Sequence, residues 1–345
     1  MPSIRDVARY AEVSPATVSM VANGREGVAR DTRRRVEMAI RKLGYRSKRP
    51  GRSNNGRKSG ATYNVGLIFP VATEHYRSGR IPLYDHWIRG ARRVLAAHGD
   101  HPTVFTGPRL DEEDALFRSL LEAGELDGLI FAGVSFEYFA VRWAVESNLP
   151  VVAINRRSGH GEFSYVGCDN YRGGRLAIEH LLSLGHRRIA LVRPPQRPTF
   201  VDDRLAGARD ALRREQIEPA GELVFRRDVD VSVGAAEVIE QARAEHVTAM
   251  FAVNDPLASG LTTGLEAADI TVPEQMSVIG FDHIGQDLTE SGKQLSTIGT
   301  NHQQIGEASA DVLRSLMNHW PRVRAISRCF DVYLVEGDTT GPAPQ

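Results

Sequence analysis

Residues 4–24, IRDVARYAEVSPATVSMVANG, predict two short helices joined by a tight turn. Apolar residues recur at helical spacing in the first half of this stretch. Ser14 followed by Pro15 is a typical helix start, because a serine side chain can accept a hydrogen bond from a free backbone N–H group. Asn23-Gly24 is a stop signal, and a third helix is predicted over residues 31–43. The three helices predict a compact head.

The order of these elements predicts a helix-turn-helix, in which the first helix braces the second for insertion into the major groove of DNA. Two ordinary packed helices would give a similar pattern. The distribution of charge favours the DNA interpretation, although the net charge of the chain is zero. Residues 1–60 hold 15 Lys and Arg against 5 Asp and Glu, and the other 285 residues hold 28 against 38. A basic head on an acidic body fits a DNA-binding protein whose body does not itself adhere to phosphates.

The domain boundary is predicted in the segment RSKRPGRSNNGRKSGAT, residues 46–62, which is polar and has no apolar periodicity. This places a helix-turn-helix domain at residues 1–46, a basic linker at 47–62 and a body at 63–341. In the body, β-rich runs such as NVGLIFP alternate with helical stretches, a pattern typical of βαβ units and a parallel sheet. The alternation restarts after Gly185, which predicts two similar α/β halves.

Several other classes of protein are disfavoured. The two cysteines, Cys168 and Cys329, lack metal or disulfide spacing and suit a reducing cytosol. No apolar run has the length of a signal peptide core or a membrane span. His98 and His101 stand at a helix end without further ligands nearby, so we interpret them as surface residues. The segment GVSFE, residues 133–137, fails the nucleophile-elbow pattern, and no P-loop or HExxH motif occurs. We therefore expect a cytoplasmic protein without catalysis, cofactor or metal.

The longer string from residue 4 to residue 24, followed by VEMAIRKLGYR, closely resembles the DNA-binding head of the lactose-repressor (LacI/GalR) family. The segments LPVVAINR, CDNYRGGRLAIEHLLSLGHRRIALV, DRLAGARDAL, FAVNDPLASG, VPEQMSVIGFDHI and LSTIGTNHQQIG resemble that family's core motifs in the same order. The resemblance implies an N-terminal all-α helix-turn-helix domain and an α/β periplasmic-binding-protein-like body of two doubly wound parallel-sheet subdomains. It also implies that the chain crosses between the subdomains near residues 185, 299 and 329.

The function that the resemblance implies is that of a homodimeric transcriptional regulator, a repressor, which binds a pseudo-palindromic DNA operator. A small effector, a sugar or related metabolite, is expected in the cleft between the subdomains, where it changes the angle between them. The alternative function is a solute-binding receptor built on the same body. The basic head and the lack of a signal peptide disfavour that alternative.

The family's base-reading positions fall on Pro15, Ala16 and Met20, which are all apolar. Met20 cannot form a bidentate hydrogen bond to guanine, so contacts to thymine methyl groups or readout of DNA shape are expected, with weak base discrimination. The family's phosphate-binding positions fall on Ser3, Ser14, Thr17, Ser19 and Asn23. Plain helix capping by Ser14 and Asn23 is the alternative, and the two roles can coexist.

The linker departs from the family. Members usually carry an Ala-Arg-x-Leu hinge helix, whose leucine wedges into the minor groove at the operator centre. Here Pro50-Gly51 and SNNG occupy that stretch, and the distance from Tyr45 to Gly66 is longer. We expect basic side chains to follow phosphates or the minor groove instead, namely those of Lys48, Arg49, Arg52, Arg57 and Lys58. A flexible tether that does not contact DNA is the alternative.

The family's effector-binding positions fall on Arg204 in DRLAG, Asn254 in AVND and Asp282 in GFD. Each is predicted near the carboxyl end of a strand, where open α/β sheets bind ligands. Such groups can donate to and accept from adjacent hydroxyls, which suits sugars and nucleosides. Tyr84 stands where the family has an aromatic residue, and Arg172 is a further candidate contact. The alternatives are that the polar groups satisfy loop backbone and that Tyr84 packs in the core.

Overall fold

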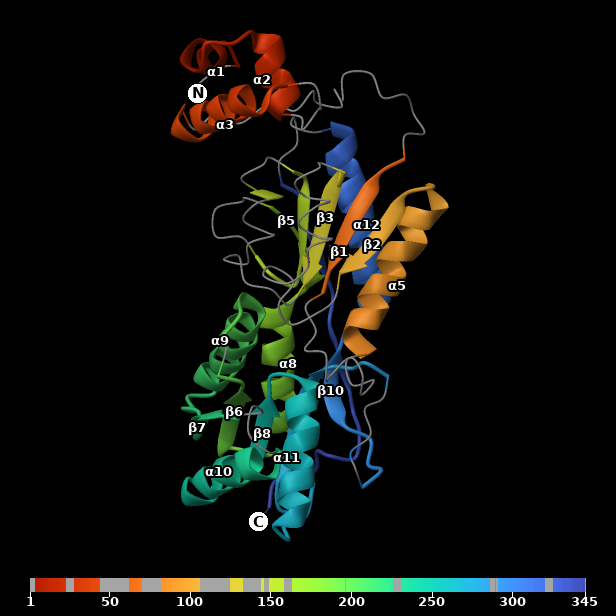
Figure 1. Ribbon diagram of the computed structural model, residues 1–345. Coiled ribbons are helices and arrows are strands. Elements are labelled where there is room, and N and C mark those ends of the chain that lie inside the picture. The colour runs from red at the N-terminus through yellow and green to blue at the C-terminus, as the bar shows by residue number, and fades with distance from the viewer. Residues whose placement is uncertain are drawn as a thin grey trace. The chain divides into compact units, whose positions relative to one another are not determined.

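The computed structural model describes residues 4–22, 28–43, 62–69, 82–105, 125–132, 144–145, 149–157, 163–195, 197–225, 231–285, 289, 291–319 and 325–344. The chain divides into two compact units, Met1–Ala61 and Thr62–Gln345, which are a helical head and an α/β body (Figure 1). The predictions for residues 47–61 of the linker lie outside the described residues. Among the described helices, none is both long and apolar enough to cross a membrane.

The head consists of α1 (Ile4–Ala11), α2 (Pro15–Ala22) and α3 (Arg30–Leu43), as the sequence predicts. The first helix ends at Glu12, whose φ of 54° is the left-handed conformation that closes many helices. Small and β-branched side chains from all three helices form a shared core, which includes Val7, Val18, Val36 and Ala39. This packing fixes α2 against the other two helices.

The first subdomain of the body is built on a six-stranded parallel sheet of order β11-β5-β4-β3-β1-β2. Its described elements are β1 (Asn64–Ile68), α5 (Pro82–Ala97), β2 (His101–Phe105), β3 (Gly128–Ala132), β4 (Val151–Ile154), β5 (Ser164–Cys168), α12 (His302–His319) and β11 (Ser327–Phe330). The central strands are buried along their whole length, as their continuous apolar sequences predict. Helix α12 contacts α5 and strands β3 to β5, so it belongs to this subdomain.

The second subdomain is built on a six-stranded sheet of order β12-β10-β9-β8-β6-β7, in which β12 at one edge is antiparallel and the other strands are parallel. Its elements are α8 (Asn170–Ser183), β6 (Ile189–Arg193), α9 (Thr199–Arg214), β7 (Gly221–Val224), α10 (Val231–Ala244), β8 (Ala249–Ala252), α11 (Asp255–Ala267), β9 (Ser277–Asp282), β10 (Ser296–Gly299) and β12 (Tyr333–Val335). Two similar sheets confirm the predicted pair of doubly wound subdomains.

The chain changes subdomain at three places among the described elements. The first lies between β5 and α8, because α8 packs on strands β8, β9 and β10 of the second sheet. It therefore precedes the position near residue 185 that the family resemblance implied, by the length of α8. The other two changes lie between β10 and α12 and between β11 and β12. Each subdomain is consequently assembled from separate stretches of sequence.

Helices α8 and α9 lie side by side in Figure 1 and approach each other very closely. A Cβ atom on Gly174 of α8 would lie 1.9 Å from the backbone oxygen of Arg204, and one on Gly207 of α9 would lie 1.8 Å from the backbone oxygen of Tyr171. Both distances are far below van der Waals contact. The absence of a side chain at these two positions thus sets how near α9 can come to α8.

Two buried histidines attach the C-terminal segment to the second subdomain. His186 lies 3.0 Å from both the Thr248 and Ser277 hydroxyls, and its Nε2 lies 3.1 Å from the Gly341 carbonyl oxygen. Nε2 of His180 lies 2.9 Å from the Thr340 hydroxyl. Burial lowers the pKa of both imidazoles, against weaker opposing contributions from their surroundings.

We expect the protein to lose stability as the pH falls from 7.5 to 5.5. The pKa of each buried histidine is lower in the folded state, so below about pH 6.5 the unfolded chain binds more protons and unfolding is favoured. The urea midpoint at the two pH values measures the effect, and His186→Gln should reduce the difference. The exposed variant His98→Gln should retain it. Equal midpoints at both pH values for the unaltered protein would contradict the expectation.

Candidate functional site

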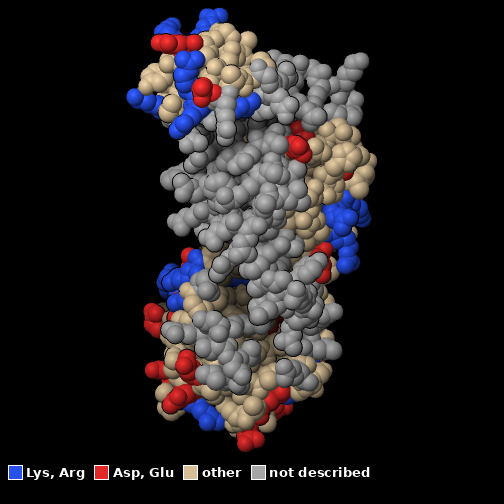
Figure 2. All heavy atoms as spheres, viewed as in Figure 1, with Lys and Arg blue, Asp and Glu red and all other residues tan. Residues whose placement is uncertain are grey.

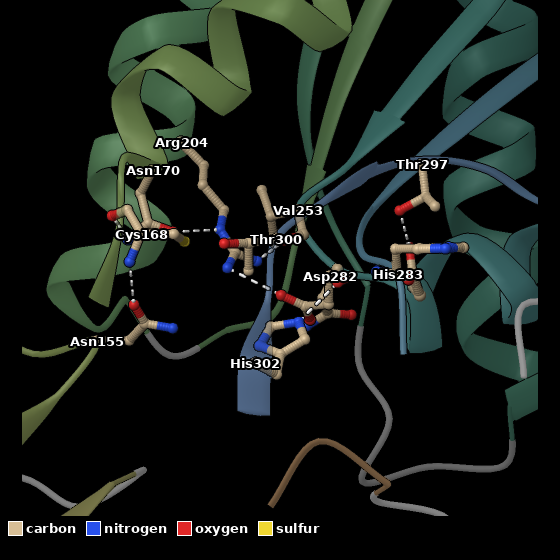
Figure 3. Close-up of polar contacts among 12 residues, drawn as sticks. Asn155, Cys168, Asn170, Arg204, Val253, Asp282, His283, Thr297, Thr300 and His302 are labelled. Carbon is tan, nitrogen blue, oxygen red and sulfur yellow. Dashed lines mark hydrogen bonds and ion pairs between the residues drawn. The ribbon is translucent and has the colours of Figure 1, made fainter. Parts of the chain in front are cut away.

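A buried arginine organises the carboxyl edge of the second sheet (Figure 3). Arg204 of α9 is 2% exposed, and its Nε donates to Oδ1 of Asn170 at 2.9 Å. Its Nη1 donates to the carbonyl of Val253 at 2.6 Å, and its Nη2 donates to Oδ1 of Asp282 at 2.9 Å. The guanidinium carbon also lies 3.5 Å from the ring centre of Phe281. One side chain therefore connects the residues that follow β5, those that follow β8 and the end of β9.

Asp282 is the acidic partner of Arg204, and its backbone is held in an unusual conformation. Its φ is 124°, a region that favours glycine, and the residue is 6% exposed. Nε2 of His302 donates to its carbonyl oxygen at 2.6 Å, and the following amide, of His283, donates to Oδ2 of Asp255 at 2.7 Å. Asp255 in turn accepts from the Thr297 hydroxyl at 2.5 Å. These contacts hold the strained backbone at Asp282 in place, and they therefore fix the position of the Asp282 carboxylate.

His302 carries a proton on Nε2 at this site. A carbonyl oxygen can only accept, so the contact with Asp282 requires the proton on Nε2. Burial lowers the pKa of His302, and the Asp282 carboxylate opposes that change without reversing it. Among the described residues, neither Nδ1 of His302 nor Nε1 of Trp87 has a hydrogen-bond partner, and both atoms are buried. The two rings pack edge to face with centres 5.9 Å apart.

Two further predicted effector residues lie near the Arg204–Asp282 pair. Asn254 directly follows Val253, and its side-chain oxygen accepts from the Leu257 amide at 3.0 Å, which caps α11. This leaves the amide nitrogen of Asn254 without a partner among the described residues. Tyr84, from the first subdomain, packs against Trp87 with ring centres 5.5 Å apart. Burial raises the pKa of Tyr84 to about 12, and the Asp282 carboxylate adds to the rise, so this phenol stays protonated.

Arg172 is not part of this group. Its backbone amide donates to Oδ1 of Asp169 at 2.9 Å, which caps α8. Its exposed side chain forms a 3.0 Å ion pair with Asp331, in the segment that joins β11 to β12. Asn170, two residues earlier in the first turn of α8, is the residue that contacts Arg204. Two polar residues of the same helical turn therefore have different partners.

Sequence reasoning missed three residues of the site, which are Phe281, His302 and Asp255. Signals for them exist in the chain. Phe281 directly precedes Asp282, so an aromatic ring next to the buried carboxylate was available for the arginine. Asp255 follows Asn254 at the start of α11, and His302 follows β10, so both stand at carboxyl ends of strands.

The head presents the predicted DNA-contacting residues on α2. Ser14, Pro15 and Ala16 are exposed, and Thr17 and Met20 are partly buried. Ser3, Asn23 and the side chain of Ser19 lie outside the described residues. Figure 2 shows Lys and Arg side chains gathered on the surface of the head. The exposed basic residues of its described part are Arg5, Arg9, Arg34, Arg35 and Lys42.

Ser14 caps α2, since its Oγ accepts from the Thr17 amide at 3.0 Å and lies 2.8 Å from the Thr17 hydroxyl. We expect Ser14→Ala to lower the stability of the head by about 1 kcal/mol and Ser14→Gly by only a few tenths, because glycine is tolerated at N-caps. Thermal unfolding followed by circular dichroism measures this difference.

The same two variants test whether the Ser14 hydroxyl also contacts DNA. Both remove the hydroxyl, so a phosphate contact predicts an equal loss of DNA affinity in both. A loss of affinity in Ser14→Ala alone would contradict the phosphate contact and leave capping as the role of this residue.

Comparisons with known proteins agree with this geometry. The family model for bacterial regulatory proteins of the lacI family matches residues 3–48, and that for the periplasmic binding protein-like domain matches residues 178–340. The transcriptional regulator CelR of Thermobifida fusca is 32% identical over 284 residues, which are 81% of this chain and 82% of CelR.

Two solved structures have the same fold over nearly the whole chain. A complex of CelR with cellobiose gives a TM-score of 0.72 at 25% identity and covers 98% of this chain and 100% of that chain. The lac repressor dimer bound to operator and the anti-inducer ONPF gives 0.64 at 25% identity and covers 99% of both chains. Since head, body and a relative at 32% identity all agree, the protein belongs to the lacI family of bacterial regulatory proteins.

Proposed function

We propose that the protein is a transcriptional repressor that acts in the cytoplasm as a homodimer on a pseudo-palindromic operator, under the control of a small polyhydroxylated effector. The observation that carries the proposal is the buried Arg204–Asp282 pair at the carboxyl edge of the second sheet, where α/β folds of this type bind ligands. The lac repressor, whose dimer has been solved on its operator, and CelR, solved with cellobiose, support both halves of the proposal.

The unused polar atoms at the site match the hydroxyls of a sugar or nucleoside. Arginine has five N–H donors, and Arg204 uses three of them on the described residues. Among the described residues, none donates to Oδ2 of Asp282 and none accepts from the amide nitrogen of Asn254. A pair of adjacent ligand hydroxyls can donate to the Asp282 carboxylate and accept from the free N–H groups of Arg204 and Asn254. In this proposal Tyr84 covers the effector from the first subdomain, and Arg172 contributes from the rim.

In the proposed mechanism, the effector binds one angle between the subdomains more tightly than another. This difference in affinity supplies all of the free energy that couples effector binding to DNA binding, which is typically about 1–3 kcal/mol in allosteric proteins. The change of angle moves the two heads of the dimer relative to half-sites one helical turn apart. On DNA, the serine and threonine side chains of the head bind phosphates, and Pro15, Ala16 and Met20 contact thymine methyl groups.

We do not assign an enzymatic activity to the cleft. The relative with 32% identity is a transcriptional regulator, which supports the same view.

Selection of operator DNA from a random pool tests the proposal. The full chain should enrich a palindrome, bind it with an affinity that falls steeply with salt, and lose that binding when residues 1–60 are removed. Enrichment of no sequence would contradict repressor function and favour the solute receptor.

The effector is then sought with the purified full chain and a panel of sugars and nucleosides that includes cellobiose and ribose. A true effector should raise the unfolding temperature and change operator affinity, and both effects should disappear in Asp282→Asn. A compound that acts equally on Asp282→Asn does not bind at the proposed site.

A further inference from the structure

A direct ion pair joins the two subdomains of the body in addition to the three segments where the chain crosses. Arg157 follows β4 of the first subdomain, and Asp203 lies on α9 of the second. Nη2 of Arg157 is 2.5 Å from Oδ2 of Asp203, and the backbone amide of Arg157 donates to the Thr199 hydroxyl at 3.4 Å. Residues at the end of β4 thus hold the first turn of α9 by both a side chain and the backbone.

The surroundings of Arg157 orient its guanidinium group toward α9. Its guanidinium carbon lies 5.9 Å from the ring centre of Tyr165, and the Tyr165 hydroxyl donates to the carbonyl of Cys168 at 3.2 Å. Tyr165 is buried in the first sheet, so it forms a fixed wall beside the arginine. The Arg157 side chain is 55% exposed and that of Asp203 is 28% exposed. Water therefore weakens the pair without separating it.

The position of the pair distinguishes it from ordinary surface ion pairs. Arg187–Glu215 and Arg188–Glu245 each join residues of the second subdomain, so their energies are the same at any angle between the subdomains. The partners Arg157 and Asp203 separate when the subdomains rotate apart. An interaction made in only one of two conformations changes the balance between them by its own free energy.

Asp203 also directly precedes Arg204, the residue that organises the effector site. A contact that holds the first turn of α9 against the first subdomain therefore holds the helix from which Arg204 extends. We infer that the Arg157–Asp203 ion pair is an interdomain bridge. It favours the arrangement of the subdomains described here, in which the two residues are in contact and which we call closed, and it positions α9 for effector binding. Its consequence for the effector rests on the function proposed above.

The size of the effect follows from the exposure of the pair. Exposed ion pairs contribute little, so removal of one partner should shift the ratio of open to closed body by about two- to fivefold. A shift of this size tunes the effector response without abolishing it. Arg157 is in this sense a positioning residue and need not touch the effector.

The test measures the distance between the subdomains in the full-length protein without effector or DNA. Spin labels are attached at Ala97→Cys in α5 and Glu240→Cys in α10, which are both exposed positions, in a Cys329→Ser background. Labelled chains are mixed with an excess of unlabelled chains, so that the distances within one chain are measured by double electron–electron resonance.

Arg157→Gln and Asp203→Asn should each increase the population at long distances by about two- to fivefold. The exchanged pair, Arg157→Asp with Asp203→Arg, should restore the original distribution, which a purely local packing role would not do. Arg187→Gln, at a matched exposed pair inside one subdomain, should leave it unchanged. Unaltered distances in both single variants, or no restoration by the exchanged pair, would overturn the inference. Because no sugar or operator is present, either result is independent of whether the proposed function holds.

Discussion

Replacement of Arg204 by methionine should lower the free energy of unfolding of the body by about 3–5 kcal/mol, because it leaves the buried Asp282 carboxylate without its cation. Methionine retains much of the length and the packing against the Phe281 ring, so the loss reports mainly the missing charge and hydrogen bonds. The acceptors at Asn170 and Val253 also lose their donor, which adds to the cost.

Urea unfolding followed by circular dichroism measures this loss. Arg213→Met is the matched control on the same helix, and it should change stability by less than about 1 kcal/mol because the Arg213 side chain is 74% exposed. The double variant Arg204→Met with Asp282→Asn should recover part of the stability, since the unpaired charge at position 282 is then removed. A loss in Arg204→Met no larger than that in Arg213→Met would show that the buried pair does not stabilise the body.

Gly174→Ala and Gly207→Ala should each destabilise the body by about 3 kcal/mol, at the upper end of the usual cost of overpacking. The added Cβ atoms would lie within 2 Å of the backbone oxygens of Arg204 and Tyr171, and backbone atoms cannot rotate away as side chains do. Alanine forms helices better than glycine by about 1 kcal/mol, so intrinsic propensity alone predicts the opposite sign. The two helices must separate, which displaces Arg204 from Asp282.

The comparison with Gly221→Ala isolates the effect of the close approach. The nearest atom to a Cβ at Gly221 is Cδ2 of Leu223, at 3.1 Å, which is the movable end of a side chain. This variant should therefore be nearly neutral in the same urea titration. Stability gained in Gly174→Ala and Gly207→Ala would indicate that α8 and α9 can separate at little cost.

The regular elements of the body followed from the sequence where their patterns are long. The apolar run of β1 and the alternation of strands with helices in the body were predicted, and the described elements follow that order. Arg204 and Asp282 were also expected near the same edge, because strand ends in parallel sheets meet there. The local pattern was sufficient in these cases. A strand buried on both faces has a continuous apolar sequence, and a helix buried on one side has apolar residues at helical spacing.

Other features depend on contacts between distant segments and could not be obtained in this way. Arg172 and Asn170 share one turn of helix, and which of them faces Arg204 depends on how α8 packs on the second sheet. The same packing places the first crossing before α8, although Gly185 is the more visible break in the sequence. The bridge from Arg157 to Asp203 joins residues 46 positions apart, in segments that no local pattern relates.

The three changes of subdomain have a consequence for the order in which the protein is made. A ribosome that has completed the first half of the chain has not yet produced α12 or β11, although α12 packs on three strands of the first sheet and β11 forms one of its edges. The amino-terminal subdomain therefore cannot reach its native structure before nearly all of the carboxyl-terminal one has been synthesised. The nascent first sheet must expose its apolar face to chaperones or to solvent during that interval. The chain is therefore most prone to aggregation before α12 and β11 have been synthesised.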